Sequence, residues 1–308
     1  MAGPDASVPR SDPLLGWHAG VAADASRLQA AHAERVCHPG RVRQSDPIAA
    51  RAEAVARARL RWYAALPGVR TMTGEGWLAV ASGAGSNDLN GVVSEPDARL
   101  DEATVRRIRD WFEGLPASWL ATAASAELTG LLTGCGAMPE RTGWWFGRDL
   151  PRDAPVPTRE SPAVVAPVES EGDLDAWLDV AAVCGWVESD ADRAARRRLH
   201  LAAGLGYPHL RHWLAVVDGS AVAMASSYLD RDVVDLCNLA VLPGFRRRGI
   251  GTLLATHRMK EAASAGAAFA VGALSHDGAA LYRTLGFRAV PVTPDVCFYL
   301  PAGPDRLA

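Results

Sequence analysis

The sequence has almost no lysine and no long apolar run. Of its 32 Lys and Arg residues only Lys260 is a lysine. No stretch of about 18 apolar residues occurs, and the first residues lack the basic segment followed by an apolar run that marks a secretory signal. We therefore expect no membrane-spanning segment and a cytoplasmic location.

Cysteine motifs are also missing. The five cysteines are odd in number and far apart, with no C-x-x-C and no Cys/His pair at the spacing of metal ligands. This pattern is typical of buried, reduced thiols. It predicts neither a disulfide framework nor a metal site.

Neither half of the chain carries an excess of positive charge. Residues 1–155 hold 17 basic and 18 acidic residues, and the remainder holds 15 basic and 17 acidic residues. We therefore expect no nucleic-acid partner and no binding to an anionic membrane. The 308 residues are 49% hydrophobic and 22% charged, which is typical of a globular protein of about two domains.

The first half alternates between helical and strand patterns. Apolar spacing predicts helices over 14–36, 47–66, 101–114 and 125–133, and strands over 76–81, 91–93, 118–122 and 143–146. Prolines then become frequent between residues 149 and 167, which indicates a linker. We place an N-terminal α/β domain at 1–150, the linker at 151–161 and a second domain at 162–303.

The second half begins with helices and continues mainly as strands. We expect helices over 171–184, 189–204, 252–265 and 277–285, and strands over 163–167, 212–217, 221–229, 233–242, 267–273, 288–292 and 297–300. Three antiparallel strands followed by helix, strand, helix and two closing strands predict an α+β fold. Its sheet would be mixed but mostly antiparallel, and flanked by helices.

An arginine- and glycine-rich loop joins the end of a predicted strand to the start of a helix. It consists of Arg246, Arg247, Arg248, Gly249, Ile250, Gly251 and Thr252. The first turn of a helix offers unpaired N–H groups and a partial positive charge, so it can bind a diphosphate where no side chain blocks the approach. The glycines remove such side chains, and the arginines add donors at the rim. The alternative for the three arginines is a solvated turn.

The context of this loop is more specific than its glycines. The order strand, R-x-x-G-x-G at Arg246, Gly249 and Gly251, helix, strand, a short helix with Tyr282, then Gly286-Phe287 resembles the GNAT superfamily of N-acetyltransferases. The resemblance covers about residues 162–301. It implies a GNAT fold and acetyl-CoA as co-substrate. The loop is not a Rossmann fingerprint, and it is not a P-loop because no Lys-Ser/Thr pair follows the glycine.

The resemblance also implies roles for individual residues. The pantetheine arm would pair with the backbone of Leu239, Ala240 and Val241, and the pyrophosphate would lie on residues 247–252. Ser275 stands where the family often has an Asn that contacts the coenzyme. Tyr282 would protonate the departing thiolate, since a phenol with a pKa of about 10 stays protonated at neutral pH. The alternative is a core tyrosine.

The sequence identifies the base that deprotonates the amine less specifically than it identifies the acid. Asp235 is the best-placed carboxylate, because it lies on the strand leading to Val241 and in phase with it. A surface or substrate-positioning carboxylate is the competing interpretation. Asn238, whose side chain is expected on the other face of the strand, is another candidate for lining the site.

The first half repeats the coarse order of the second but lacks R-x-x-G-x-G. We interpret it as a degenerate GNAT-like domain that covers the acceptor pocket or forms an interface. The leading hypothesis for the whole chain is transfer of an acetyl group from acetyl-CoA to a primary amine of a small molecule, by direct attack of that amine. A non-catalytic acyl-CoA sensor and a protein N-terminal or lysine acetyltransferase remain alternatives. The sequence leaves open the acceptor's identity and whether the protein forms a homodimer.

Overall fold

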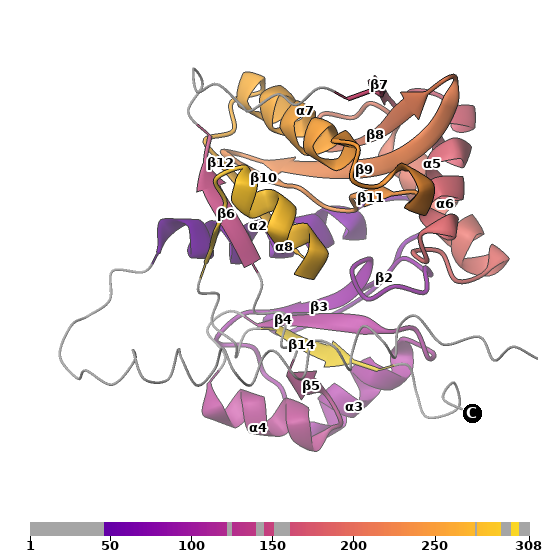
Figure 1. Ribbon diagram of the computed structural model, residues 1–308. Coiled ribbons are helices and arrows are strands. Elements are labelled where there is room, and N and C mark those ends of the chain that lie inside the picture. Colours follow the sequence, from indigo (N-terminus) through magenta and orange to yellow (C-terminus); the bar gives the residue numbers. More distant parts are fainter. Residues whose placement is uncertain are drawn as a thin grey trace, which may run out of the picture. The chain divides into compact units, whose positions relative to one another are not determined.

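A computed structural model describes residues 46–121, 125–139, 145–150, 161–274, 276–290 and 297–301 (Figure 1). The chain divides into residues 1–45 and a compact unit of residues 46–308. The helix expected over 14–36, the linker residues 151–160 and Ser275 lie outside the described residues.

The first sheet has two helices packed on one face. Its strands run in the order β1 (Arg70–Gly74), β2 (Trp77–Ala81), β3 (Asn90–Ser94), β4 (Ala117–Ala121), β14 (Cys297–Leu300) and β5 (Met138–Pro139). β3 and β4 are parallel, and the other neighbours are antiparallel. The helices are α3 (Glu102–Trp111) and α4 (Ala126–Gly134). They bury Trp119 and neighbouring apolar residues, which makes this face a hydrophobic core.

The second sheet carries the predicted coenzyme loop. Its order is β13 (Arg288–Ala289), β6 (Trp145–Asp149), β12 (Phe269–Ala273), β10 (Val233–Asp235), β9 (Ser220–Asp230), β8 (Leu210–Val217) and β7 (Val164–Pro167), and β11 (Ala240–Val241) pairs with β9. β10 and β12 are parallel, and the other neighbours are antiparallel. The helices α7 (Ile250–Ser264) and α8 (His276–Thr284) pack on one face.

Two further helices belong to this second half. They are α5 (Glu171–Val183) and α6 (Asp190–Ala203). Ser189 caps α6, its side chain accepting a hydrogen bond from the Asp192 N–H. α5 packs against β8 and β9 on the face opposite α7. The predicted α+β fold is therefore confirmed.

The two sheets have the same plan and exchange a strand. The order β1-β2-β3-β4-β14-β5 corresponds, direction by direction, to β8-β9-β10-β12-β6-β13, with the parallel pair at the same place. β6 comes from the first half of the chain but lies between β12 and β13, and β14 comes from the C-terminal end but lies between β4 and β5. The expectation that residues 297–300 close the second sheet was wrong. The domain limits themselves stay a prediction.

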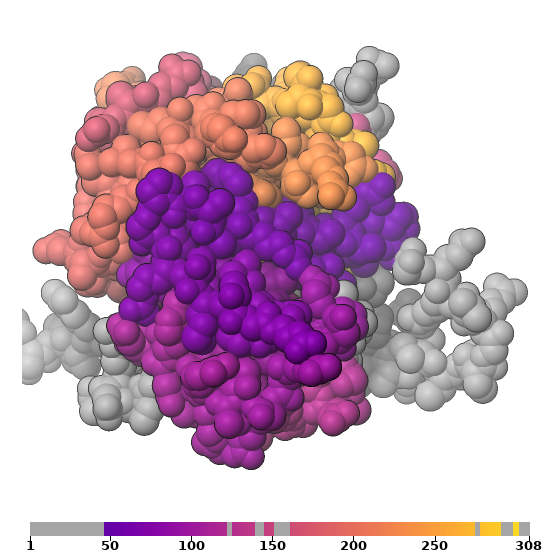
Figure 2. All heavy atoms as spheres, turned by 180° about the vertical axis from the view of Figure 1, so that it is seen from behind, coloured from indigo at the N-terminus to yellow at the C-terminus, as the bar shows by residue number. Residues whose placement is uncertain are grey.

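Helix α2 (Pro47–Ala64) lies between the two sheets (Figure 1). It packs against glycines on both sides. A Cβ at Gly91 of β3 would lie 2.7 Å from Leu60 Cδ1, and one at Gly147 of β6 would lie 2.2 Å from Ile48 Cγ2. Figure 2 shows the indigo and purple segments between the orange and magenta parts of the surface. Each sheet is thus covered on both faces, with α2 shared.

None of the helices in the described part of the chain combines the length and the apolar character needed to span a bilayer.

Candidate active site

The strand expected over residues 233–242 consists of two strands separated by a bulge. β10 pairs with β9 up to Asp235–Tyr228, and β11 resumes that pairing at Ala240–Met224. Four residues, 236–239, therefore stand opposite three, 225–227, which defines a β-bulge. Asn238 within it has a positive φ of 53°. The single-strand expectation was wrong at this point.

The bulge separates β11 from β12. β10 runs parallel to β12 as far as the pair Asp235–Val271, whereas β11 has β9 as its partner among the described strands. The Leu242 N–H donates to Val222 O at 2.9 Å. Because antiparallel pairing alternates, Ala240 also turns its backbone groups toward β9, and those of Leu239 and Val241 face the opening. Of the three residues predicted to pair with pantetheine, Leu239 and Val241 therefore direct their backbone N–H and C=O groups away from β9, where an extended chain could pair with them.

The predicted coenzyme loop begins directly after β11. A 3₁₀ turn, Pro243–Phe245, leads into the arginines, and Gly249 then caps α7 in the left-handed conformation, with a φ of 79°. This cap makes no side-chain hydrogen bond to the first turn of the helix. The first-turn N–H groups are thus not capped by a side chain of the Ncap residue, as an anion site requires.

The three arginines differ in what they contact. Arg246 turns back, and its Nε donates to Val241 O at 3.0 Å. The guanidinium of Arg248 lies over the Phe245 ring, 5.2 Å from its centre. All three arginines are exposed. Arg246 therefore braces the end of β11 through its Nε, and its expected role as a donor to the coenzyme stays a prediction.

Tyr282 lies on α8, and its hydroxyl is buried against an arginine of α7. Its side chain is 2% exposed. The Arg258 Nη2 donates to Tyr282 Oη at 2.6 Å. Burial raises the pKa of Tyr282, and the positive charge of Arg258 opposes that rise. The phenol is therefore protonated at neutral pH, as a proton donor must be.

Asp235 is buried and paired with an arginine of α2. Arg59 Nη1 lies 2.6 Å from Asp235 Oδ2, and the carboxylate side chain is 3% exposed. The surface interpretation of Asp235 is therefore wrong. Burial raises the pKa of Asp235, and the charge of Arg59 opposes the rise. A raised pKa makes this carboxylate a stronger proton acceptor.

Tyr282 and Asp235 approach the strand opening from opposite faces of the second sheet. Val233 packs with α2, whereas Val234 packs with α7 and α8. Alternation along β10 places Asp235 on the α2 face. The charges of Asp235 and Arg258 both act on Cys237, in the bulge between them. The structure thus brings the predicted acid and base to the same opening.

Cys237 and three histidines of the second sheet and its helices have structural roles. Burial raises the pKa of Cys237 to about 12, so its thiol is neutral and a poor nucleophile. His200 and His212 are buried with ring centres 4.4 Å apart, and His212 Nδ1 is 2.7 Å from Ser226 Oγ. His209 Nδ1 is 2.8 Å from Leu229 O. These contacts give the three histidines structural roles in the second sheet.

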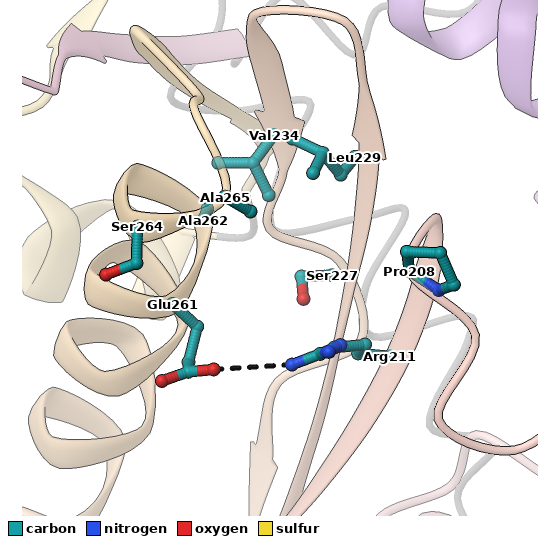
Figure 3. Close-up of a pocket in the computed structure, with 9 residues that line it drawn as sticks. All are labelled: Pro208, Arg211, Ser227, Leu229, Val234, Glu261, Ala262, Ser264 and Ala265. Carbon is teal, nitrogen blue, oxygen red and sulfur yellow. Dashed lines mark hydrogen bonds and ion pairs between the residues drawn. The ribbon is translucent and has the colours of Figure 1, made fainter.

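A separate cavity of about 270 Å³ lies at the other end of α7 (Figure 3). Arg211 and Glu261 form an ion pair of 3.3 Å across it. The 15 residues of α7 span roughly 20 Å between this cavity and the coenzyme loop. The cavity is therefore not the predicted site.

The comparison with known proteins concerns mainly the second half of the chain. Residues 174–287 match the model described as the acetyltransferase (GNAT) family, which confirms for this segment the resemblance seen in its sequence. None of the curated proteins matches the chain. A GCN5-related N-acetyltransferase from Kribbella flavida is 20% identical, with a TM-score of 0.57 over 82% of this chain and 95% of that one, and it shows the fold.

Two other solved structures are more distant. A tandem GNAT protein from the clavulanic acid biosynthesis pathway is 15% identical, with a TM-score of 0.47 over 82% of this chain and 88% of that one. A predicted acetyltransferase with acetyl-CoA from Clostridium acetobutylicum is 16% identical, with a TM-score of 0.36 over 41% of this chain and 90% of that one.

The sequence reasoning missed Arg59 and Arg258. Both lie on helices, where arginine is normally an exposed residue. Arg59 follows Arg51 by eight residues, and both form ion pairs with residues near β10, Arg51 with Asp232 at 3.0 Å. The spacing between Arg51 and Arg59, about two helical turns, is the one signal in the sequence that could have placed these two arginines on a common face of the helix.

Proposed function

We propose that this protein is an acetyl-CoA-dependent N-acetyltransferase that acetylates a primary amine of a small molecule by direct attack. The observation that carries the proposal is the opening between β11 and β12 next to the glycine-capped start of α7. Among the described residues the outward backbone groups of β11 have no strand partner, which suits an extended amide chain. Val241 O accepts from Arg246 Nε and keeps a second lone pair. A helix start suits a diphosphate.

The residues at the opening fit the coenzyme. The backbone groups of Leu239 and Val241 would bind the pantetheine amides, and the N–H groups of residues 247–252 would bind the pyrophosphate, with the Thr252 hydroxyl as a further donor. Gly251 is close to a neighbour, since a Cβ there would lie 3.3 Å from Leu281 Cδ2. A side chain at 251 would therefore crowd the loop.

Two side chains would move the protons. Asp235 accepts a proton from the incoming ammonium, which frees the nitrogen lone pair to attack the acetyl carbonyl carbon. The carbon–sulfur bond breaks as the new carbon–nitrogen bond forms, and Tyr282 protonates the departing thiolate. The second amine proton leaves to water, Asp235 releases the proton that it accepted to water, and Tyr282 regains a proton from water, so that one proton is released in each turnover. No acyl-enzyme is needed.

The environment of Asp235 favours a small acceptor. α2 packs over this face of the sheet and pairs with the carboxylate through Arg59. A folded polypeptide would have to pass this helix, whereas a small amine needs a narrower route. The carboxylate also attracts an ammonium group.

The test measures binding and turnover separately. Calorimetry should show that acetyl-CoA binds, and a panel of small amines should release free thiol in a colorimetric assay. Binding without thiol release for any small amine or peptide would favour the acyl-CoA sensor. Release with peptides alone would favour a protein acetyltransferase. Absence of binding would overturn the proposal.

A further inference from the structure

Arg258 is an unusual residue for the middle of a packed sheet-and-helix core. It lies on α7, and its exposed fraction is 0%. In the described part of the chain no carboxylate lies within ion-pair distance of its guanidinium, and its Nε is buried without a hydrogen-bond partner. Burying a cation in this way is costly. A purely structural position would be expected to hold an apolar side chain.

The guanidinium joins the bulge to the proposed proton donor. Nη1 donates to the carbonyl oxygens of Ser226 and Cys237, at 2.5 and 2.9 Å, and Nη2 donates to Tyr282 Oη at 2.6 Å. Cys237 directly precedes the positive-φ residue Asn238 of the bulge. One side chain therefore contacts both the strand that opens and the phenol beside the opening.

The direction of the hydrogen bond to Tyr282 follows from chemistry. A guanidinium has donors and no acceptor, so the phenol oxygen must accept from Arg258. The phenol O–H cannot point back to Arg258 and remains free to donate elsewhere. When that proton leaves, the negative charge on the oxygen stays 2.6 Å from the guanidinium nitrogen, where a charge-assisted hydrogen bond strengthens.

We infer that Arg258 is a positioning residue for acetyl transfer, which directs the Tyr282 proton toward the thiolate and stabilises the phenolate left behind. This inference rests on the proposed function. It also explains why a cation with no directly paired carboxylate is kept in the core. Besides the more distant charge of Asp235, Arg258 would gain a directly hydrogen-bonded negative charge while Tyr282 is deprotonated. The proton goes to the coenzyme sulfur, and water restores it to Tyr282.

A titration of the phenol tests the inference without any turnover. Incorporating 3,5-difluorotyrosine at position 282 lowers the phenol's intrinsic pKa, so its absorbance can be followed at moderate pH. Arg258→Met should raise its titration midpoint by about one pH unit or more, because a hydrogen bond to a charged donor is lost. Arg258→Lys keeps the charge and should raise it less. Arg196→Met, which removes a buried arginine paired with Asp192, is the control and should not move it.

Turnover gives the second measurement. Arg258→Met should lower kcat about tenfold or more in the natural protein, but less than about twofold in a Tyr282→Phe background, because the two residues act as a unit. Equal losses in both backgrounds, or an unmoved phenol midpoint in folded Arg258→Met and Arg258→Lys, would overturn the inference. A moved midpoint in a protein that acetylates no amine would support the contact and refute the proposed function instead.

Discussion

The start of α7 allows a charge test of the coenzyme site. Gly249 caps this helix with a φ of 79°, so any other residue there pays for a left-handed backbone. Gly249→Gln and Gly249→Glu share that cost and nearly the same volume. They differ by one negative charge at the place where the coenzyme diphosphate would bind. The ratio of their affinities for acetyl-CoA therefore isolates the electrostatic part.

The size of this electrostatic difference in acetyl-CoA affinity follows from Coulomb's law. A carboxylate about 5 Å from one diphosphate charge is repelled by about 1 kcal/mol in bulk water, and by about 3 kcal/mol at an effective dielectric constant of about 20. The loop arginines are exposed, so the lower end applies. With two diphosphate charges, Gly249→Glu should bind acetyl-CoA at least about tenfold more weakly than Gly249→Gln.

Calorimetry at low and high salt measures this ratio, with circular dichroism confirming that both variants are folded. Salt screens exposed charges, so the ratio should shrink at high ionic strength. Equal acetyl-CoA affinities for Gly249→Gln and Gly249→Glu at low salt would refute the placement of the diphosphate at this helix start.

Three further changes have defined outcomes. Tyr282→Phe should lower the single-turnover rate by about 10²- to 10⁴-fold and leave equilibrium acetyl-CoA binding nearly unchanged; a loss below tenfold would fit a positioning hydrogen bond instead. Arg59→Met removes the charge that opposes the raised pKa of Asp235, so the acidic limb of the kcat–pH profile should move to higher pH, and an unmoved limb would exclude Asp235 as base. Burial lowers the pKa of His212 to about 4, so its neutral form stabilises the fold above pH 6.5, and about 3 kcal/mol of that stability should be lost as the pH falls from 6.5 toward 4. Urea unfolding at several pH values measures this loss, and an equal loss in His212→Asn would assign it to other groups.

Local patterns predicted most elements but not the exchange of strands between sheets. The spacing of apolar residues is enough to place α2, α3 and α7, because a helix repeats within one segment. The partner of β6 or β14 depends on packing between distant segments, and no local period encodes it. β1 was missed because its residues are exposed except for Met72, so it lacks an apolar alternation.

The residues of the candidate site also divide into those that a local pattern identifies and those that it does not. The glycine spacing identified Gly249 and its loop, since the requirement for a residue without a side chain is local. Arg59 and Arg258 could not be identified, because each acts on a residue far away in the sequence: Arg59 on Asp235 and Arg258 on Tyr282. On their helices they look like ordinary polar positions.

The first half of the chain therefore matters to the site although it lacks the coenzyme loop. Its helix α2 covers the face of β10 that carries Asp235 and supplies Arg59, and its last strand, β6, pairs with β12 at the centre of the second sheet. β12 is also the strand from which β11 parts to form the opening. A fragment beginning after residue 150 would lack both α2 and β6. The edge of β12 would then be unpaired, and Asp235 would lose the helix that covers it and its partner Arg59. The expectation that the first half gives only cover or an interface is too narrow. The repeated fold, the exchanged strands and the shared helix make the two halves of the described chain one structural unit next to the opening between β11 and β12.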